Sequence, residues 1–521
     1  MNVSYYINPQ KKKPWVRLVK NDAPGSNESK LQNITQQEFL SEVCSAAHEI
    51  NSDKMSRRPI YGPTGEKDKN GKEKWAIVGY DEIETVPVNK QWEIISKKIS
   101  HFAADGFWTA SETDDEEAFQ RLLSWADTAG MKTAFIEAMW HAMRTGDSAV
   151  YWYQTDDEDD PLQYEVYGYE EGSVLFPQTD FNGRQTLARK YKFNTHDAVD
   201  IFTQDRIETW MMLDSEMEDY RMFVPEGETP EVSEDGYTLV RRKDAQAGNG
   251  LCQCIYFRFN DIPTGPVQSS IEKLEDAKTY VGEHLKGTAM PILFMKAEKT
   301  TSLPPSHLAN KAIGVKGTAD SLAHADAKFL APPDASNIAD LHIDGLEEDI
   351  RDGAMSVKIS PDVIKQGSDS SATMKILYAP EVQWAQIHWP EVFKSAKQMM
   401  LVFKALVGKV EGNIPRYSKM RISVGQNIWI PQNSAEALKM ELDQVYARVK
   451  SRKAAMQDIP NAHIGDYSQI QKEWKEELEM KADAPAAAKA KYGVSGGTDD
   501  DEPKNNPGDV NNQAPGKSIQ D

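Results

Sequence analysis

PVQSSIEKLEDAKTYVGEHLK, at residues 266–286, and IADLHIDGLEEDIRD, at residues 338–352, decide the fold expected for this chain. In both stretches apolar residues recur at steps of three and four, which predicts two amphipathic helices with one apolar face each. Gly287 is expected to end the first helix, and Asn337 is expected to cap the second. The segments between and around these two helices complete the pattern.

The segment between the two helices, residues 291–333, changes to short apolar runs separated by prolines and glycines. These runs fall at residues 292–295, 312–315 and 329–331. Runs of this kind, bounded by turn residues, are typical of strands. We therefore expect a small β-containing insert between the helices.

The segment after the second helix predicts a loop followed by a long helix. Pro361 is expected to stop the second helix, and residues 367–371 form a polar Gly/Ser stretch. Apolar residues then resume at steps of four and three over 389–407, which is typical of a buried helix. Pro380 and Pro390 each remove a backbone donor, so this helix should be kinked or interrupted near both.

A second recognisable order of elements lies upstream. Residues 135–144 have helical spacing, a Gly146-Asp147 turn follows, and residues 148–154 form an aromatic strand. The later strand-like runs are 164–169, 173–176 and 186–193, and an Ile-Pro segment closes the region at 256–263. Residues 62–74 are polar and rich in Gly and Lys, so a loop is expected there.

This serial order resembles the portal proteins of tailed bacteriophages, the SPP1-like portal family. The resemblance covers residues 102–431 and rests on the order of the elements. Locally, ISPD at 359–362 is similar to the proline-containing approach of that family. GSDSSA at 367–372 is similar to the family's Ser-Gly-Ala-Leu-type start of the long helix, with Ser370-Ser371 in place of Ser-Gly.

The resemblance implies an α+β portal fold with a helix/β wing, a two-helix stem, a small α/β clip, a long kinked helix and a helical C-terminal crown. The ranges that it implies are an N-terminal wing region at 1–264, stem helix 1 at 265–289, the clip at 290–337, stem helix 2 at 338–357, a tunnel loop at 358–371, the long helix and wing return at 372–431, and crown helices at 432–482. Residues 483–521 contain scarcely any large apolar side chain, so we expect a disordered tail there.

The function implied by the resemblance is that of a ring, twelve subunits in the family, at one capsid vertex. Such a ring serves genome packaging, head–tail connection and DNA ejection. The expected partners are other copies of the chain, a terminase, a head–tail adaptor, the major capsid and scaffolding proteins, and double-stranded DNA passing through the channel. The expected location is the portal vertex of the virion after synthesis in the host cytoplasm, with no membrane partner.

Three groups of site residues follow from the resemblance. The channel-lining stem residues are Asp344, Glu348, Asp352 and Arg351, the last of which could pair between subunits. The tunnel-loop residues are Lys358, Asp362, Lys365, Gln366, Gly367, Ser368 and Asp369. The clip-interface residues are Lys311, Lys316 and Lys328. The alternative explanations are a solvated acidic helix face, an ordinary helix connection and solvated lysines.

Composition is compatible with a folded, unanchored protein. The chain has 521 residues with an apolar share of 39%, enough for two or three domain-sized cores. It has no run of eighteen apolar residues and no apolar signal core near its lysines at 11–13, so neither membrane insertion nor export is indicated. Cys44, Cys252 and Cys254 offer too few ligands for a zinc site and are expected to be reduced packing residues.

The net charge of −21 argues against a protein that grips nucleic acid through a basic surface, because such binding requires lysine and arginine clusters that release counterions. A channel through which DNA slides is a different case. An acidic lining repels phosphate and keeps bound states shallow, so DNA is not arrested by tight contacts. The charge is therefore compatible with the portal interpretation.

An enzyme is the remaining class to consider. The carboxylate run at 156–160 could suggest a divalent-metal site, but consecutive residues point in different directions and Pro161 follows, so a hairpin turn is favoured. No P-loop, GxSxG or HExxH sequence is present. We assign no catalytic residue, metal or cofactor. The alternatives to a portal are another virion structural protein and, less favoured, a metal-dependent hydrolase.

Overall fold

The structure is a computed structural model of the chain. It describes residues 2–20, 29–44, 57–67, 73–82, 85–111, 115–179, 184–213, 230–248, 250–288, 292–296, 299–300, 315–316, 326–330, 336–357 and 376–428. The chain divides into two units, residues 1–431 and 432–521, and all the described residues belong to the first. The ranges expected to form the crown helices and the tail lie outside the described residues.

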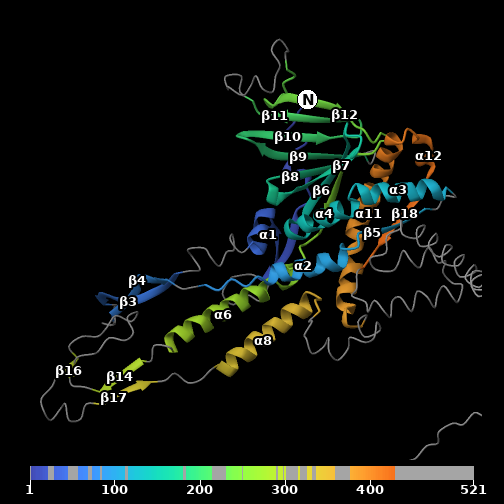
Figure 1. The fold of residues 1–521 in the computed structure, drawn as a ribbon. Coiled ribbons are helices and arrows are strands. Elements are labelled where there is room, and N and C mark those ends of the chain that lie inside the picture. Colours follow the sequence, from blue (N-terminus) through green and yellow to red (C-terminus); the bar gives the residue numbers. More distant parts are fainter. Residues whose placement is uncertain are drawn as a thin grey trace, which may run out of the picture. The chain divides into compact units, whose positions relative to one another are not determined.

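The main core lies between helices and a three-stranded antiparallel sheet (Figure 1). The helices are α2 (Lys90–Phe102), α3 (Glu116–Thr128), α4 (Met131–Thr145) and α11 (Ala379–Val410), and the strands, in sheet order, are β13 (Cys254–Arg258), β6 (Asp147–Gln154) and β7 (Leu162–Gly168). Fully buried Phe135, Trp152, Phe257 and Phe403 fill the space between α4, α11 and the sheet. The helix, turn and strand predicted for residues 135–154 are confirmed.

A five-stranded antiparallel sheet packs beside the first one. Its strands, in sheet order, are β12 (Thr238–Asp244), β11 (Arg206–Met211), β10 (His196–Phe202), β9 (Gln185–Phe193) and β8 (Val174–Thr179). A separate apolar cluster joins the two sheets, in which Tyr167, Phe202, Cys252 and Cys254 are buried. Both of these cysteines are free thiols, as expected of packing residues, and Cys44 is also free.

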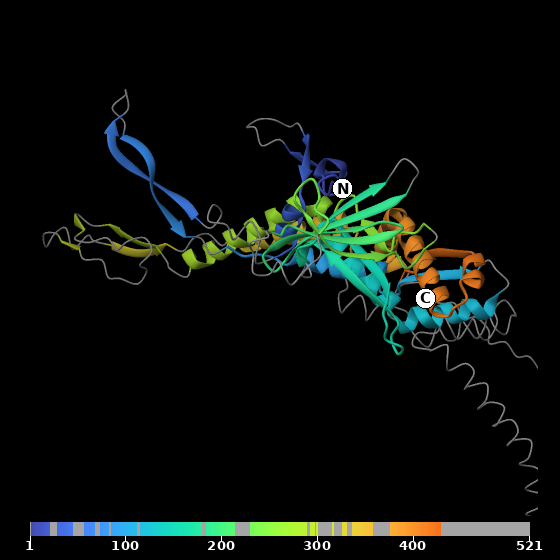
Figure 2. The same cartoon turned by 90° about the horizontal axis from the view of Figure 1, so that it is seen from above.

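The N-terminal elements pack around this body. They are η1 (Pro9–Lys11), β1 (Trp15–Lys20), β2 (Ser29–Ile34), α1 (Gln36–Val43), β3 (Arg57–Lys67) and β4 (Glu73–Glu82). Strands β3 and β4 pair with each other as a long twisted ribbon (Figure 2). The loop expected at 62–74 was therefore wrong in extent, because β3 continues through Gly62 and Gly65 to Lys67 and β4 begins at Glu73.

The order helix, β insert, helix is confirmed between residues 268 and 353. Helix α6 (Gln268–Thr288) follows a short 3-10 helix, η4 (Gly265–Val267), and α8 (Ser336–Gly353) packs against it. Between them β14 (Ile292–Lys296) pairs with β17 (Asp326–Leu330), and β15 (Lys299–Thr300) pairs with β16 (Val315–Lys316), all antiparallel. Helix α8 starts one residue before Asn337, so that residue lies inside the helix and is not its cap, and the helix ends at Gly353, short of 357.

The C-terminal part of the described chain returns to the main core. Helix α11 is 32 residues long. It begins at Ala379 with Pro380 in its first turn, and it is not interrupted at Pro390. Helix α12 (Ile414–Lys419) follows, and β18 (Ile422–Gln426) pairs with β5 (Phe107–Ser111), which is more than 300 residues away in sequence. The remaining short helix, η3 (Tyr169–Glu171), follows β7. Within the described stretches no helix is both long and apolar enough to span a membrane.

Candidate functional site

Helices α6 and α8 share a small apolar core of their own. Ile271 and Leu274 on α6 pack with Leu346 and Ile350 on α8, and all four are buried. Ile94 of α2 also belongs to this cluster. The apolar stripe of each helix is thus covered by the other helix and by α2, so the polar faces turn outward.

The outward face of α8 carries the acidic residues predicted to line a channel. Asp344, Glu348 and Asp352 follow one another at steps of four, which places them on one face of the helix, and all three are exposed. Side-chain exposure is 68% for Glu348 and 73% for Asp352. Because three carboxylates of like charge gather on this face, it is a strip of negative potential.

Arg351 lies beside that strip and pairs within its own helix. Its Nη2 donates to Glu348 Oε1 at 3.2 Å, and its Nε lies 3.6 Å from Asp352 Oδ1. The structure therefore brings together the four residues assigned to the stem from sequence. In the single chain, Arg351 offsets part of the acidic charge locally, and its pairing between subunits stays a prediction.

A salt bridge connects the two helices at the edge of the acidic face. Lys278 Nζ on α6 donates to Glu347 Oε1 on α8 at 3.0 Å. The hydrogen bond from Lys278 lowers the pKa of the Glu347 carboxyl below its ordinary value. Glu347 thus connects the two helices, whereas Asp344 is part of the exposed strip.

The other predicted site residues are described in part or not at all. Lys316 lies in β16 with Lys299 of β15 as its register partner, and Lys328 lies in β17 opposite Phe294. The backbone therefore places both lysines on the strands between α6 and α8, and their side chains are outside the described set. Lys311 and the whole tunnel loop, residues 358–371, also lie outside the described residues.

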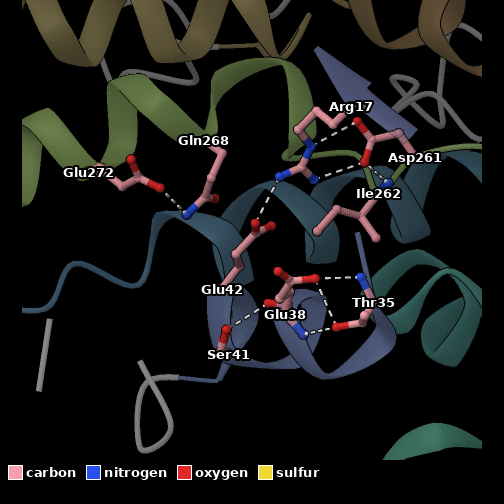
Figure 3. A network of polar contacts seen from close by, with 9 residues as sticks. All are labelled: Arg17, Thr35, Glu38, Ser41, Glu42, Asp261, Ile262, Gln268 and Glu272. Carbon is pink, nitrogen blue, oxygen red and sulfur yellow. Dashed lines mark hydrogen bonds and ion pairs between the residues drawn. The ribbon is translucent and has the colours of Figure 1, made fainter. Parts of the chain in front are cut away.

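Sequence reasoning missed a polar network at the start of α6 (Figure 3). Arg17 of β1 donates from Nη1 to Glu42 Oε1 at 2.8 Å and from Nη2 to Asp261 Oδ1 at 2.8 Å. Burial raises the pKa of Glu42 to about 7, although Arg17 opposes this rise. The three residues lie up to 244 positions apart, so no spacing pattern in the sequence could have indicated them.

A second missed network ties the N-terminal segment to the first residue of β6, Asp147. Lys12 Nζ lies 2.7 Å from the fully buried Asp147 Oδ2, and Tyr256 Oη donates to the same oxygen at 2.8 Å. Gln36 Nε2 donates to Asp147 Oδ1 at 2.6 Å. Burial lowers the pKa of Lys12. The sequence indicated a turn at Gly146-Asp147, and in the structure Asp147 begins β6 and its carboxylate anchors the N-terminal segment.

The carboxylate run at 156–160 lies in the hairpin turn between β6 and β7. Its turn is closed by Thr155, whose N–H donates to the Pro161 carbonyl at 2.9 Å and whose hydroxyl donates to the Asp160 carbonyl at 2.8 Å. The predicted hairpin is confirmed. Across the described residues, His, Cys, Asp and Glu side chains form no cluster of three or more suited to a metal ion.

Comparison with known proteins identifies the family. The family model described as phage portal protein, SPP1 Gp6-like, matches residues 80–484. No curated protein matches the chain. Two similar solved structures are the virion of a native gene transfer agent particle and the neck of an empty gene transfer agent particle computed with C6 symmetry. Each is 11% identical, with a TM-score of 0.35, and the match covers 69% of this chain and 85% of the other. Since the family model spans well over half of its residues, the chain belongs to the SPP1 Gp6-like phage portal proteins.

Proposed function

We propose that copies of this chain close into a ring that forms a DNA channel at one capsid vertex, and that this channel serves packaging, head–tail connection and ejection. Membership of the phage portal family supports a structural role for this protein rather than an enzymatic one. The observation that carries the channel is the exposed acidic strip of Asp344, Glu348 and Asp352 on α8. This strip would face the DNA.

The proposed mechanism follows from electrostatics. A duplex is a dense line of phosphates, and a lining that attracted it would create deep binding sites along the path. An acidic lining repels the phosphates from all sides, so the duplex is centred and every intermediate position has a similar free energy. The motor then works against a nearly level profile. Arg351 limits the repulsion locally by pairing with Glu348.

Exposed apolar side chains on the same helices support association with another copy. Tyr280 on α6 and Leu341 on α8 are 63% and 75% exposed, although their helices bury an apolar stripe elsewhere. In a closed ring each subunit presents two different faces to its neighbours, and such a contact would cover these side chains. The proposed stoichiometry is twelve, as the resemblance implies.

The proposal also gives roles to the stem, the clip and the tunnel loop. Helices α6 and α8 form the stem, residues 290–337 form the clip with its lysines at an interface, and 358–371 form a tunnel loop that touches DNA. The proposed partners are a terminase, a head–tail adaptor, and the capsid and scaffolding proteins. The proposed location is the virion.

The direct test is the state of the purified full-length chain. Negative-stain images and native mass spectra should show closed rings with a central channel at micromolar concentration and moderate salt. A monomer alone under these conditions would contradict the ring. Another virion structural protein, the alternative left open by the sequence, would give particles without a central channel.

The acidic strip has its own test. The double variant Glu348→Lys and Asp352→Lys should form normal rings but package DNA slowly, because lysines create attractive positions along the path. The matched control is Asp156→Lys with Glu158→Lys, which changes the charge equally in the exposed β6–β7 turn. Equal packaging by both double variants in a phage complementation assay would place the strip away from the DNA.

A further inference from the structure

Helix α2 contacts two separate apolar cores. Ile94 packs in the small core with α6 and α8, whereas Ile95, Ile99 and Phe102 pack in the main core. The ring of Phe102 lies edge-on to Trp384 of α11, with centroids 5.8 Å apart. One short helix therefore touches the stem pair on one side and the long helix on another.

The same helix carries a charge that is completely buried. Lys98 Nζ lies 2.7 Å from Glu381 Oε2 of α11, and the two side chains are 0% and 1% exposed. The ammonium group also donates to the carbonyl of Met355 at 2.8 Å and lies 5.0 Å from the centre of the Trp384 ring. Burial lowers the pKa of Lys98, and Glu381 opposes this change.

Glu381 completes the connection to the end of α8. Its Oε1 accepts from the N–H of Val357 at 3.3 Å. Two buried side chains thus hold three segments: the middle of α2, residues 355–357 directly after α8, and the first turn of α11. None of these contacts is local in sequence, since Lys98 and Glu381 are 283 residues apart.

The backbone at Met355 adds a second, independent observation. This residue has a φ of +52°, a conformation usually taken by glycine after a helix. Its N–H donates to the Asp352 carbonyl at 3.0 Å, and the next N–H, of Ser356, donates to Arg351 at 2.9 Å. A non-glycine residue keeps this conformation when its surroundings hold it there. Here the Met355 carbonyl is held by Lys98.

We propose that Lys98 and Glu381 are positioning residues that lock the end of α8 to the start of α11, so that the acidic stem and the long helix move as one body. The inference rests on the proposed channel function. A buried ion pair contributes little net stability compared with apolar groups of similar volume, but it fixes geometry because both partners must stay in contact. This connection, the lock, would keep the acidic strip on α8 in a fixed position relative to α11 while DNA passes.

The test replaces the pair with apolar side chains. In the full-length chain, Lys98→Met with Glu381→Leu should keep the rings and lower the melting temperature only modestly, because no charge is left unpaired and only the Met355 carbonyl and the Val357 N–H lose their partners. Amide hydrogens at 354–357 should exchange roughly tenfold faster, and packaging should fall by about tenfold. The control is Glu93→Gln with Lys97→Gln, which removes an ion pair from the surface of the same helix.

Different results would contradict the lock and the channel. Wild-type exchange and packaging in rings of the double variant would overturn the proposal. If that variant fails to fold, Glu381→Asp decides: it keeps the charge but is one methylene too short to reach both Lys98 and the Val357 N–H. Wild-type exchange and packaging by Glu381→Asp would also overturn the lock. Absence of rings from the unmodified chain would instead contradict the channel, while the exchange comparison would still test the lock.

Discussion

Glu275 on α6 is a carboxyl group whose burial sets a pH dependence. Its side chain is 1% exposed and accepts from the Val88 N–H at 3.0 Å. Burial raises its pKa from 4.5 to about 7, and the nearby Glu272 adds to this rise. The folded chain therefore holds this proton more tightly than the unfolded chain. Its contribution to stability is complete below about pH 4.5 and is lost as the pH rises through about 7.

Glu275→Gln should remove that dependence while keeping the acceptor for Val88. At pH 8 the variant should be more stable than the wild type, by up to about 3 kcal/mol, and the difference should vanish near pH 4.5. Thermal unfolding from pH 4.5 to 8 measures this. Asp276→Asn, at an exposed position on the same helix, is the control and should show little change. A difference between Glu275→Gln and wild type that does not vary with pH would contradict the assignment.

Gly146 offers a second test at a single residue. Its φ is +89°, and a Cβ there would meet the buried Trp15 ring at 2.8 Å. Gly146→Ala should cost about 3 kcal/mol, because it combines an unfavourable backbone with a clash. Gly172→Ala has a similar φ of +80° with nothing within 4 Å, so it should cost only about 1 kcal/mol. Equal losses in the free energy of unfolding, measured with denaturant, would show that the Trp15 ring moves aside at no cost.

At the scale of elements, α6 and α8 separate two kinds of apolar side chain. Ile271 is fully buried between the helices, whereas Leu341 is 75% exposed. Ile271→Ala should destabilise the subunit by about 3 kcal/mol through loss of packing. Leu341→Ala should leave subunit stability within about 0.5 kcal/mol but weaken ring assembly, because the neighbouring copy would cover it. Chemical denaturation measures the first effect, and sedimentation of serial dilutions measures the second.

The elements predicted from sequence are those with a local signal. The spacing of three and four placed α6 and α8, and turn residues placed the β insert between them. The end of α8 was missed because Met355 adopts a conformation that sequence rules associate with glycine, and its support comes from Lys98. The exposed acidic strip could be predicted because helical spacing alone defines it. The Lys98–Glu381 pair could not, since only the folded chain brings residues 283 positions apart together.

At the scale of the whole molecule, charge governs contact with free DNA. A ring of twelve chains at −21 each would carry a charge on the order of −250. Duplex DNA outside the channel should therefore bind more weakly than about 10 µM at near-physiological salt. Fluorescence anisotropy with a labelled duplex measures this. Tight binding that weakens steeply with added salt would reveal a basic surface, contrary to the proposal.

The pairing of β5 with β18 bears on when a subunit becomes complete. Strand β5, at residues 107–111, can pair with β18 only after residues 422–426 have been synthesised. Helix α11 can likewise join the core only after the segment from α6 to α8 has been synthesised. On the ribosome, the first 260 residues would emerge with an uncovered apolar surface and remain so until about four-fifths of the chain has been synthesised. Nascent chains should thus need shielding by a chaperone, and a truncation before residue 379 should be cleared by proteases rather than accumulate as a half-built subunit.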